Sequence, residues 1–150
     1  MRDAGLRLAR SLLGYKGRRD VVIVATTPAS LPIAEGVADV LRLPWDIFLV
    51  RAIAGGAVAR GAYVPNAKAL SYAGMSLIAF VEAAKAEEQH IAELEASYRG
   101  DRSPARLTGT SVILVDDGAS SVEDLVSAMT AIRRHGVNEI IVVSPLVART

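Results

Sequence analysis

Residues 111–126 read SVILVDDGASSVEDLV, and this stretch decides the fold class. Its first five residues form a mostly apolar, β-branched run, which is typical of a buried strand. Two acids, Asp116 and Asp117, follow at once, and a loop of small residues leads into a helical pattern. A strand that passes through a polar loop into a helix is the repeating unit of a parallel α/β sheet, in which ligands bind beyond the carboxyl ends of the strands.

Three further strands and three helices fit the same scheme. Residues 21–25 (VVIVA), 46–51 (DIFLVR) and 139–144 (EIIVVS) are predicted as strands, and residues 3–14, 31–41 and 121–134 as helices. The first strand, the helix at 31–41 and the strand at 46–51 form a β-α-β unit, so these strands should be parallel with a right-handed crossover. The sequence therefore predicts one α/β domain over residues 1–150, with helices on both faces of the sheet.

The middle of the chain is patterned differently. Residues 52–73 are rich in glycine and predict a short hairpin near 57–62 with loop elsewhere. Residues 76–98 predict a long helix with a narrow apolar stripe. We expect this helix to pack across the domain, although a coiled-coil seam is the alternative. The stripe consists of four residues that recur every seven positions: Leu77, Ala84, Ile91 and Tyr98.

Composition excludes several classes of function. The 150 residues contain no cysteine, which excludes a disulfide framework, a thiolate zinc site and a cysteine nucleophile, and which fits a cytoplasmic protein. A net charge of +1 argues against nucleic-acid binding. No apolar run is long enough to span a bilayer, and the basic N-terminus lacks the apolar core of a signal peptide.

The loops after the predicted strands carry few chemically active groups. Neither histidine falls in them, and they contain no GxGxxG or Walker motif, so histidine acid/base catalysis is not supported. Adjacent carboxylates such as Asp116 and Asp117 either bind ribose hydroxyls or a hydrated magnesium ion, or are simply solvated. The candidate ligand-binding groups are Thr26, Thr27, Ser30, Arg51, Asp116, Asp117, Ser120 and Ser121.

With its two acids, glycine and small hydroxylated loop, the motif resembles the ribose-phosphate motif of type I phosphoribosyltransferases. The likeness is greatest to a bacterial group that is predicted to have this activity, and it extends over nearly the whole chain. Four stretches resemble that group: LPIAEGVADVLRLPWDIFLVRAI (31–53), EEQHIAELEASYRGDRSP (87–104), TGTSVILVDDG (108–118) and VNEIIVVSPLVA (137–148).

The resemblance implies a phosphoribosyltransferase fold, with 5-phosphoribosyl 1-diphosphate (PRPP) as substrate and Mg²⁺ as cofactor. Asp116 and Asp117 would hold the ribose hydroxyls or the Mg²⁺ ion. No residue is assigned a catalytic role, because positioning and electrostatics would carry the transfer. The ribose and phosphate would be bound by Asp116, Asp117, Gly118, Ala119, Ser120 and Ser121, and the diphosphate side by Thr26, Thr27, Ser30 and Arg51.

The chain departs from the family pattern in three loops. The family's phosphate loop continues as Thr-Gly-x-Thr, but here Ser121, Val122 and Asp124 stand at those three positions. The Pro-Arg-Gly-Gly loop after the first strand is replaced by residues 27–30 (TPAS), and a lysine after Arg51 is replaced by alanine. These changes remove positive charge and add negative charge where a phosphate dianion would bind.

A capping box explains the added acids without a ligand. Ser120 as N-cap and Glu123 as the third helical residue fit the capping-box pattern, and Asp124 suits the positive end of the helix dipole. We therefore favour a self-capped helix start over an intact phosphate site. The PRPP motif is then degenerate in its second half.

These observations predict a phosphoribosyltransferase-like protein that is weak or inactive as an enzyme and acts as a binding or oligomeric module. The alternative is an active, Mg²⁺-dependent phosphoribosyltransferase with an unidentified acceptor. Relative to the group, the chain is expected to be shortened at its C-terminus, which would expose a sheet edge and favour a homodimer or higher oligomer. The expected ligand is a nucleotide or sugar phosphate, with no membrane and no nucleic-acid partner.

Overall fold

The computed structural model describes residues 2–145 and contains the predicted parallel sheet. Its four strands are β1 (Val21–Ala25), β2 (Trp45–Ile47), β6 (Ser111–Val115) and β7 (Glu139–Val143), in the order β2-β1-β6-β7. All neighbouring pairs are parallel, and Ala25 is in register with Ile47 on one side and Val115 on the other. The carboxyl ends of β1, β2 and β6 therefore lie at the same edge of the sheet.

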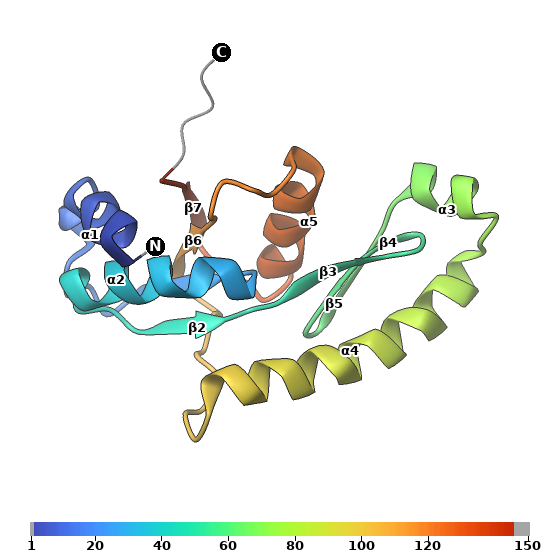
Figure 1. Ribbon diagram of the computed structural model, residues 1–150. Coiled ribbons are helices and arrows are strands. Elements are labelled where there is room, and N and C mark those ends of the chain that lie inside the picture. The colour runs from blue at the N-terminus through green and yellow to red at the C-terminus, as the bar shows by residue number, and fades with distance from the viewer. Residues whose placement is uncertain (1, 146–150) are drawn as a thin grey trace, which may run out of the picture.

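Helices cover both faces of this sheet, as predicted. Because side chains alternate along a strand, Ile23 of β1 packs in one apolar cluster and Val24 in another. The first cluster is covered by α1 (Arg2–Arg10) and α2 (Leu31–Leu41), and the second by α5 (Val122–Arg133). Figure 1 shows α1 and α2 packed together and α5 standing apart from them across the sheet.

A glycine sets the close approach of α1 to α2. A Cβ atom on Gly5 would lie 2.5 Å from the carbonyl oxygen of Ile33 and 3.3 Å from Cα of Gly36. Gly5→Ala is therefore expected to lower the free energy of unfolding by about 1–3 kcal/mol through overpacking, measured by urea denaturation. Gly14→Ala is the matched control, since no atom lies within 4 Å of that Cβ position. Equal effects of the two substitutions would contradict the prediction.

A second, antiparallel sheet extends from the first. It consists of β3 (Val50–Ile53), β4 (Gly56–Ala59) and β5 (Ala62–Pro65), and it is followed by α3 (Ala67–Ala73) and α4 (Leu77–Arg99). Figure 1 shows this sheet projecting away from the parallel sheet, with α4 running beneath it and α3 at its far end. Two short 3-10 turns, Leu13–Tyr15 and Pro28–Ser30, complete the described elements.

The structure corrects two predictions for the middle of the chain. The strand expected over 46–51 is broken, because the chain leaves the parallel sheet after Ile47 and enters the second sheet at Val50. Between them, the Leu49 amide donates to a side chain, Oε1 of Glu95, at 2.9 Å. The hairpin near 57–62 is confirmed, but the loop expected elsewhere in 52–73 is wrong, since β3 and α3 occupy much of it.

The long helix is confirmed, with Ser76 as its N-cap, but its predicted stripe is only half right. Ala84 and Ile91 are buried, whereas Leu77 and Tyr98 are 55% and 45% exposed. The remaining buried positions of α4 are Phe80 and Glu95. The helix packs across the domain, mainly on the second sheet. Its two ends extend beyond the edges of that sheet (Figure 1).

A buried ion-pair cluster, formed by Asp46, Arg60, Glu95 and Arg99, joins the two sheets and α4. Arg99 Nε lies 2.9 Å from Asp46 Oδ1, and Arg60 Nη1 lies 3.2 Å from Glu95 Oε2. Two further contacts close the cluster, Arg99 to Glu95 at 3.4 Å and Arg60 to Asp46 at 3.7 Å. Asp46 also accepts a hydrogen bond from the Ala105 amide at 2.9 Å, so this one carboxylate fixes three segments of the chain.

Candidate functional site

The polar loops meet beyond the carboxyl ends of β1 and β6. Thr26 and Thr27 follow β1, and Asp116 and Asp117 follow β6. The last residues of these two strands, Ala25 and Val115, pair with each other in the sheet. This edge is where parallel α/β sheets bind ligands. Residues 146–148, the last part of the stretch 137–148 that resembles the family, lie outside the described residues.

The two acids order the loop that follows them. Asp116 Oδ2 accepts a hydrogen bond from the Gly118 amide at 2.7 Å, and Asp117 Oδ1 accepts one from the Ala119 amide at 3.1 Å. Gly118 has φ of +90°, a conformation that favours glycine. The acids therefore shape the loop and are not merely solvated.

One of the two carboxylate oxygens of Asp116 makes no hydrogen bond within the described residues. The residue is 4% exposed, and its Oδ1 atom has no hydrogen-bond partner among residues 2–145. A buried carboxylate oxygen without a donor is costly and calls for an explanation. A ligand hydroxyl is one such donor.

The start of α5 is capped, but one residue later than predicted. Ser121, not Ser120, is the N-cap, and Asp124, not Glu123, is its partner. Ser121 Oγ accepts from the Asp124 amide at 3.1 Å, and Asp124 Oδ2 accepts from the Ser121 amide at 3.2 Å. Ser120 therefore takes no part in the cap, and Asp124 supplies the capping carboxylate.

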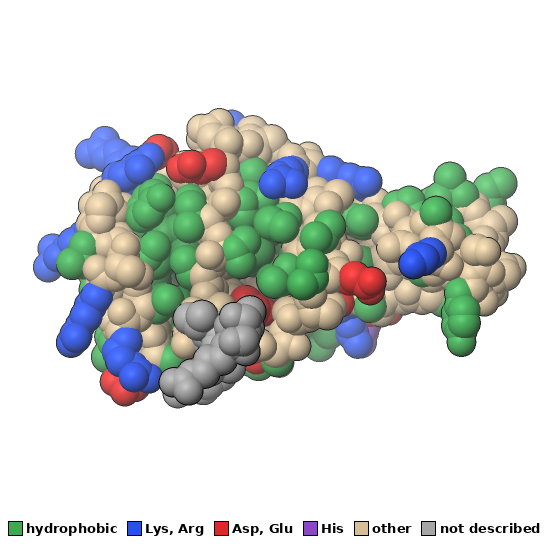
Figure 2. Space-filling model, turned by 90° about the horizontal axis from the view of Figure 1, so that it is seen from above, with side chains coloured by type: hydrophobic (Ala, Val, Ile, Leu, Met, Phe, Trp, Pro, Cys, Tyr) green, Lys and Arg blue, Asp and Glu red, His purple; other side chains and the backbone are tan. Residues whose placement is uncertain are grey.

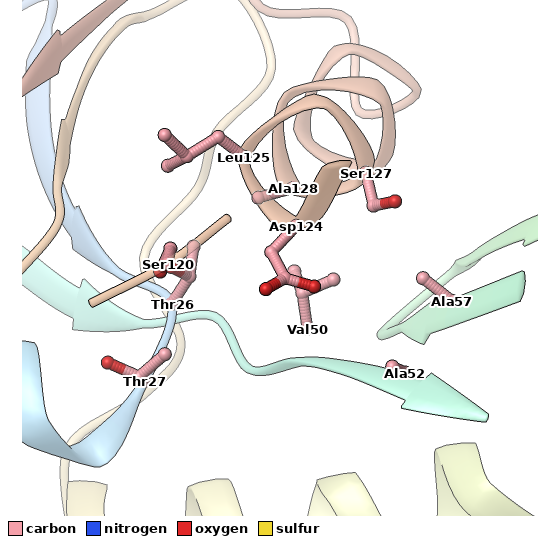
Figure 3. Close-up of a pocket in the computed structure, with 10 residues that line it drawn as sticks. All are labelled: Thr26, Thr27, Val50, Ala52, Ala57, Ser120, Asp124, Leu125, Ser127 and Ala128. Carbon is pink, nitrogen blue, oxygen red and sulfur yellow. The ribbon is translucent and has the colours of Figure 1, made fainter. Parts of the chain in front are cut away.

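A cavity of about 200 Å³ lies between the end of β1, the second sheet and α5. It brings together three of the predicted residues, Thr26, Thr27 and Ser120, with Asp124, and Figure 3 shows that the Thr27 hydroxyl points away from Asp124. The other predicted residues of the motif loop do not line it. The lining consists of Thr26, Thr27, Val50, Ala52, Ala57, Ser120, Asp124, Leu125, Ser127 and Ala128.

The loop after β1 is also satisfied internally. Ser30 is fully buried, and its amide donates to Thr27 Oγ1 at 3.3 Å. The Ser30 hydroxyl donates to the Thr27 carbonyl oxygen at 2.9 Å. Of the predicted diphosphate-side hydroxyls, Thr27 and Ser30 therefore bond to each other.

Arg51 lies apart from this cavity and has an acidic partner. Its Nε atom is 3.3 Å from Glu87 Oε1 of α4. It lines a neighbouring cavity of about 290 Å³, which shares Thr26 and Thr27 with the first but is otherwise mostly apolar. Arg51 therefore does not line the cavity that holds Asp124.

The sequence places Asp124 in the first turn of a helix and at a threonine position of the family's phosphate loop, but it does not predict that Asp124 lines this cavity. Asp124 and Ser127 are three positions apart and so lie on the same side of α5. This spacing could have predicted that the two side chains share a site. The residues Val50, Ala52 and Ala57, which also line the cavity, lie in or beside a sheet that was predicted only in part.

The described part of the chain has neither a cluster of metal-ligating side chains nor a membrane-spanning helix. Residues 2–145 contain no group of three or more metal-ligating side chains, so Asp116 and Asp117 stand without a third ligand. Within the same residues, no helix combines the length and apolarity needed to cross a membrane.

Comparison with known proteins identifies the fold. No protein-family model matches the chain. Two proteins from strains of Mycobacterium tuberculosis, each named "Putative phosphoribosyl transferase", are 26% identical over 96% of the chain. The chain spans about a third of their length, 34%.

Solved structures agree with these relatives. The protein TT1426 from Thermus thermophilus superposes with a TM-score of 0.74 and 25% identity, over 95% of this chain and 72% of that one. A hypoxanthine phosphoribosyltransferase from Staphylococcus aureus superposes with a TM-score of 0.55 and 11% identity, over 96% and 63%. The chain therefore has the α/β fold of type I phosphoribosyltransferases, as its motif predicted.

Proposed function

We propose that the chain is a ribose-binding module with a phosphoribosyltransferase-like fold that has lost efficient phosphoribosyl transfer. One observation carries this proposal: the carboxylate of Asp124 faces the cavity at the start of α5, in place of the hydroxyl found in the family motif. Asp116 and Asp117 remain at the end of β6, and the unpartnered oxygen of Asp116 supports a retained contact with a ribose hydroxyl.

Electrostatics argue against a phosphate in this cavity. At a separation of about 5 Å and an effective dielectric constant of about 20, each pair of like unit charges repels by roughly 3 kcal/mol. None of the described residues that line the cavity is Lys, Arg or His. The Ser121 amide, which a phosphate oxygen could accept from, already donates to Asp124.

The alternative function is an active, Mg²⁺-dependent phosphoribosyltransferase that uses PRPP and an unidentified acceptor. The names of the curated relatives favour it. Asp116 and Asp117 would then hold the ribose hydroxyls or the Mg²⁺ ion, and Mg²⁺ would supply charge neutralisation of the diphosphate.

Turnover of PRPP separates the two functions. We expect the wild-type chain to release no diphosphate from PRPP and Mg²⁺, with any of a panel of nucleobases, above the rate given by Asp116→Asn. This variant removes a charge from the motif while keeping an oxygen that accepts from the Gly118 amide, so it reports background hydrolysis. Release by the wild type that is lost in Asp116→Asn would refute the proposal and support the alternative.

We also retain the proposal that the chain self-associates. Val126 of α5 and Val142 of β7 are 50% and 40% exposed. Figure 2 shows hydrophobic side chains, in green, spread over the face between the end that carries α1 and the end that carries α3. Light scattering at micromolar concentration tests this proposal, and a monomeric mass would contradict it.

A further inference from the structure

The cavity beside Asp124 is lined by hydroxyl groups that have no partner. Thr26, Ser120 and Ser127 all line it, and within residues 2–145 none of their hydroxyls takes part in a hydrogen bond. Thr26 is only 4% exposed, and it lines the cavity at the end of β1. Each hydroxyl can donate and accept, so together they suit a ligand that is itself hydroxylated.

The charge of the cavity is negative. Asp124 uses Oδ2 to accept from the Ser121 amide, which leaves Oδ1 without a protein donor in the described chain. Figure 3 shows the carboxylate pointing from α5 into the cavity, toward Val50. An ionised carboxylate accepts hydrogen bonds only, so it favours a ligand hydroxyl or ammonium group at this point.

The size and walls of the cavity fit one sugar ring. Its volume of about 200 Å³ is smaller than the roughly 300 Å³ at which sites for drug-sized ligands begin. The lining also contains five apolar residues, Val50, Ala52, Ala57, Leu125 and Ala128. Hydroxyl and aliphatic groups in one cavity match the hydroxyls and C–H groups of a furanose.

We propose that this cavity binds a pentose ring that carries a hydroxyl or ammonium group, and no phosphate, on the carbon nearest Asp124. The inference rests on the proposed function and names its ligand class. The chemistry is shared by free pentoses and by ribonucleosides, and both are therefore included in the test. This mode of binding differs from that of a protein that recognises a sugar through its phosphate.

Titration calorimetry of four ligands tests the inference. D-ribose and uridine are each compared with their 5-phosphorylated forms, ribose 5-phosphate and uridine monophosphate. We expect the wild type to bind at least one unphosphorylated ligand about tenfold more tightly than its phosphorylated form, because Asp124 repels the phosphate. Whether D-ribose or uridine binds more tightly identifies the source of the pentose.

Two variants that each remove one carboxylate serve as probe and control. Asp124→Asn keeps an oxygen that accepts from the Ser121 amide but removes the charge, and it should reduce the tenfold preference to about threefold or less. Glu123→Gln makes the same change in net charge, but Glu123 lines a separate groove with Asn66 and Tyr72 of the α3 region. It should leave the preference unchanged, and thermal unfolding checks that both variants fold.

Three outcomes would overturn the inference: equal or tighter binding of a phosphorylated ligand, binding of none of the four at millimolar concentration, or equal effects of the two variants. Diphosphate release from PRPP is measured on the same preparation. Release would refute the proposed function, whereas a preference for phosphate without release would refute this inference alone.

Discussion

Glu95→Ala is expected to lower the free energy of unfolding by about 3–5 kcal/mol, the usual effect of breaking a buried ion pair. Glu95 is 1% exposed and is ion-paired with Arg60 and Arg99 in the buried ion-pair cluster. Alanine would leave both guanidinium groups with one acid fewer and would remove the acceptor of the Leu49 amide. Urea denaturation at neutral pH measures the change.

An exposed glutamate on the same helix provides the control. Glu82 pairs with Lys85 at 3.4 Å, but its side chain is 69% exposed, so Glu82→Ala should change the free energy of unfolding by about 0–1 kcal/mol. Similar losses in the two variants would show that the effect comes from the helix and not from the buried ion-pair cluster.

The pH dependence of stability gives a second readout of Glu95. Burial raises the pKa of Glu95 above its ordinary value of 4.5, although Arg60 and Arg99 lower it. The folded state thus holds this proton more tightly than the unfolded chain. The contribution of this protonation to the free energy of unfolding is fully present below pH 4.5, and it is lost as the pH rises through the raised pKa of Glu95. Relative to Glu95→Gln, the wild type should therefore gain stability as pH falls toward 4.5, and a constant difference would contradict this.

The parallel sheet was predictable because its two central strands, β1 and β6, are buried on both faces. Residues 21–25 and 111–115 are apolar runs without alternation, and both are entirely buried. Hydrophobic periodicity also sufficed for α2 and α4. The motif residues then pointed to the edge of the sheet at which the cavity lies, since ligand position follows from sheet topology.

The connection between the sheets was not predictable from local pattern. Asp46 and Arg99, which pair in the buried ion-pair cluster, are 53 positions apart in the sequence. Residues 46–51 read as one continuous strand because their apolar residues satisfy either sheet. Only the tertiary contacts of Glu95 and Phe48 decide where it divides.

The candidate site was predictable in its residue types more than in its geometry. Ser120 and Ser121 are both good N-caps, so local preference could not choose between them, and a shift of one residue exchanges the roles of Glu123 and Asp124. The shift decides which carboxylate faces the cavity. The binding chemistry inferred for that cavity depends on this single register.

Phe48→Ala is expected to lower the free energy of unfolding by about 3–5 kcal/mol, the usual loss for a large aromatic side chain removed from a core. Phe48 is fully buried at the point where the chain passes from β2 to β3. Its ring makes an edge contact with His135, centroid to centroid at 5.2 Å, and the Arg60 guanidinium lies 5.3 Å from its centroid. The ring thus links α5's C-terminal end, the second sheet and the buried ion-pair cluster.

Two further variants separate the role of this ring from general hydrophobic content. Tyr72→Ala removes an aromatic side chain of similar size that is 97% exposed, and it should change the free energy of unfolding by less than about 0.5 kcal/mol. Phe48→Leu keeps much of the volume but loses the aromatic contacts, and it should fall between the two. Because Phe48 does not line the cavity beside Asp124, the folded fraction of each variant should retain the ligand preference of the wild type. A loss for Phe48→Ala below about 1.5 kcal/mol would mean that the second sheet closes over the gap, and that the two sheets are joined by the ion pairs alone.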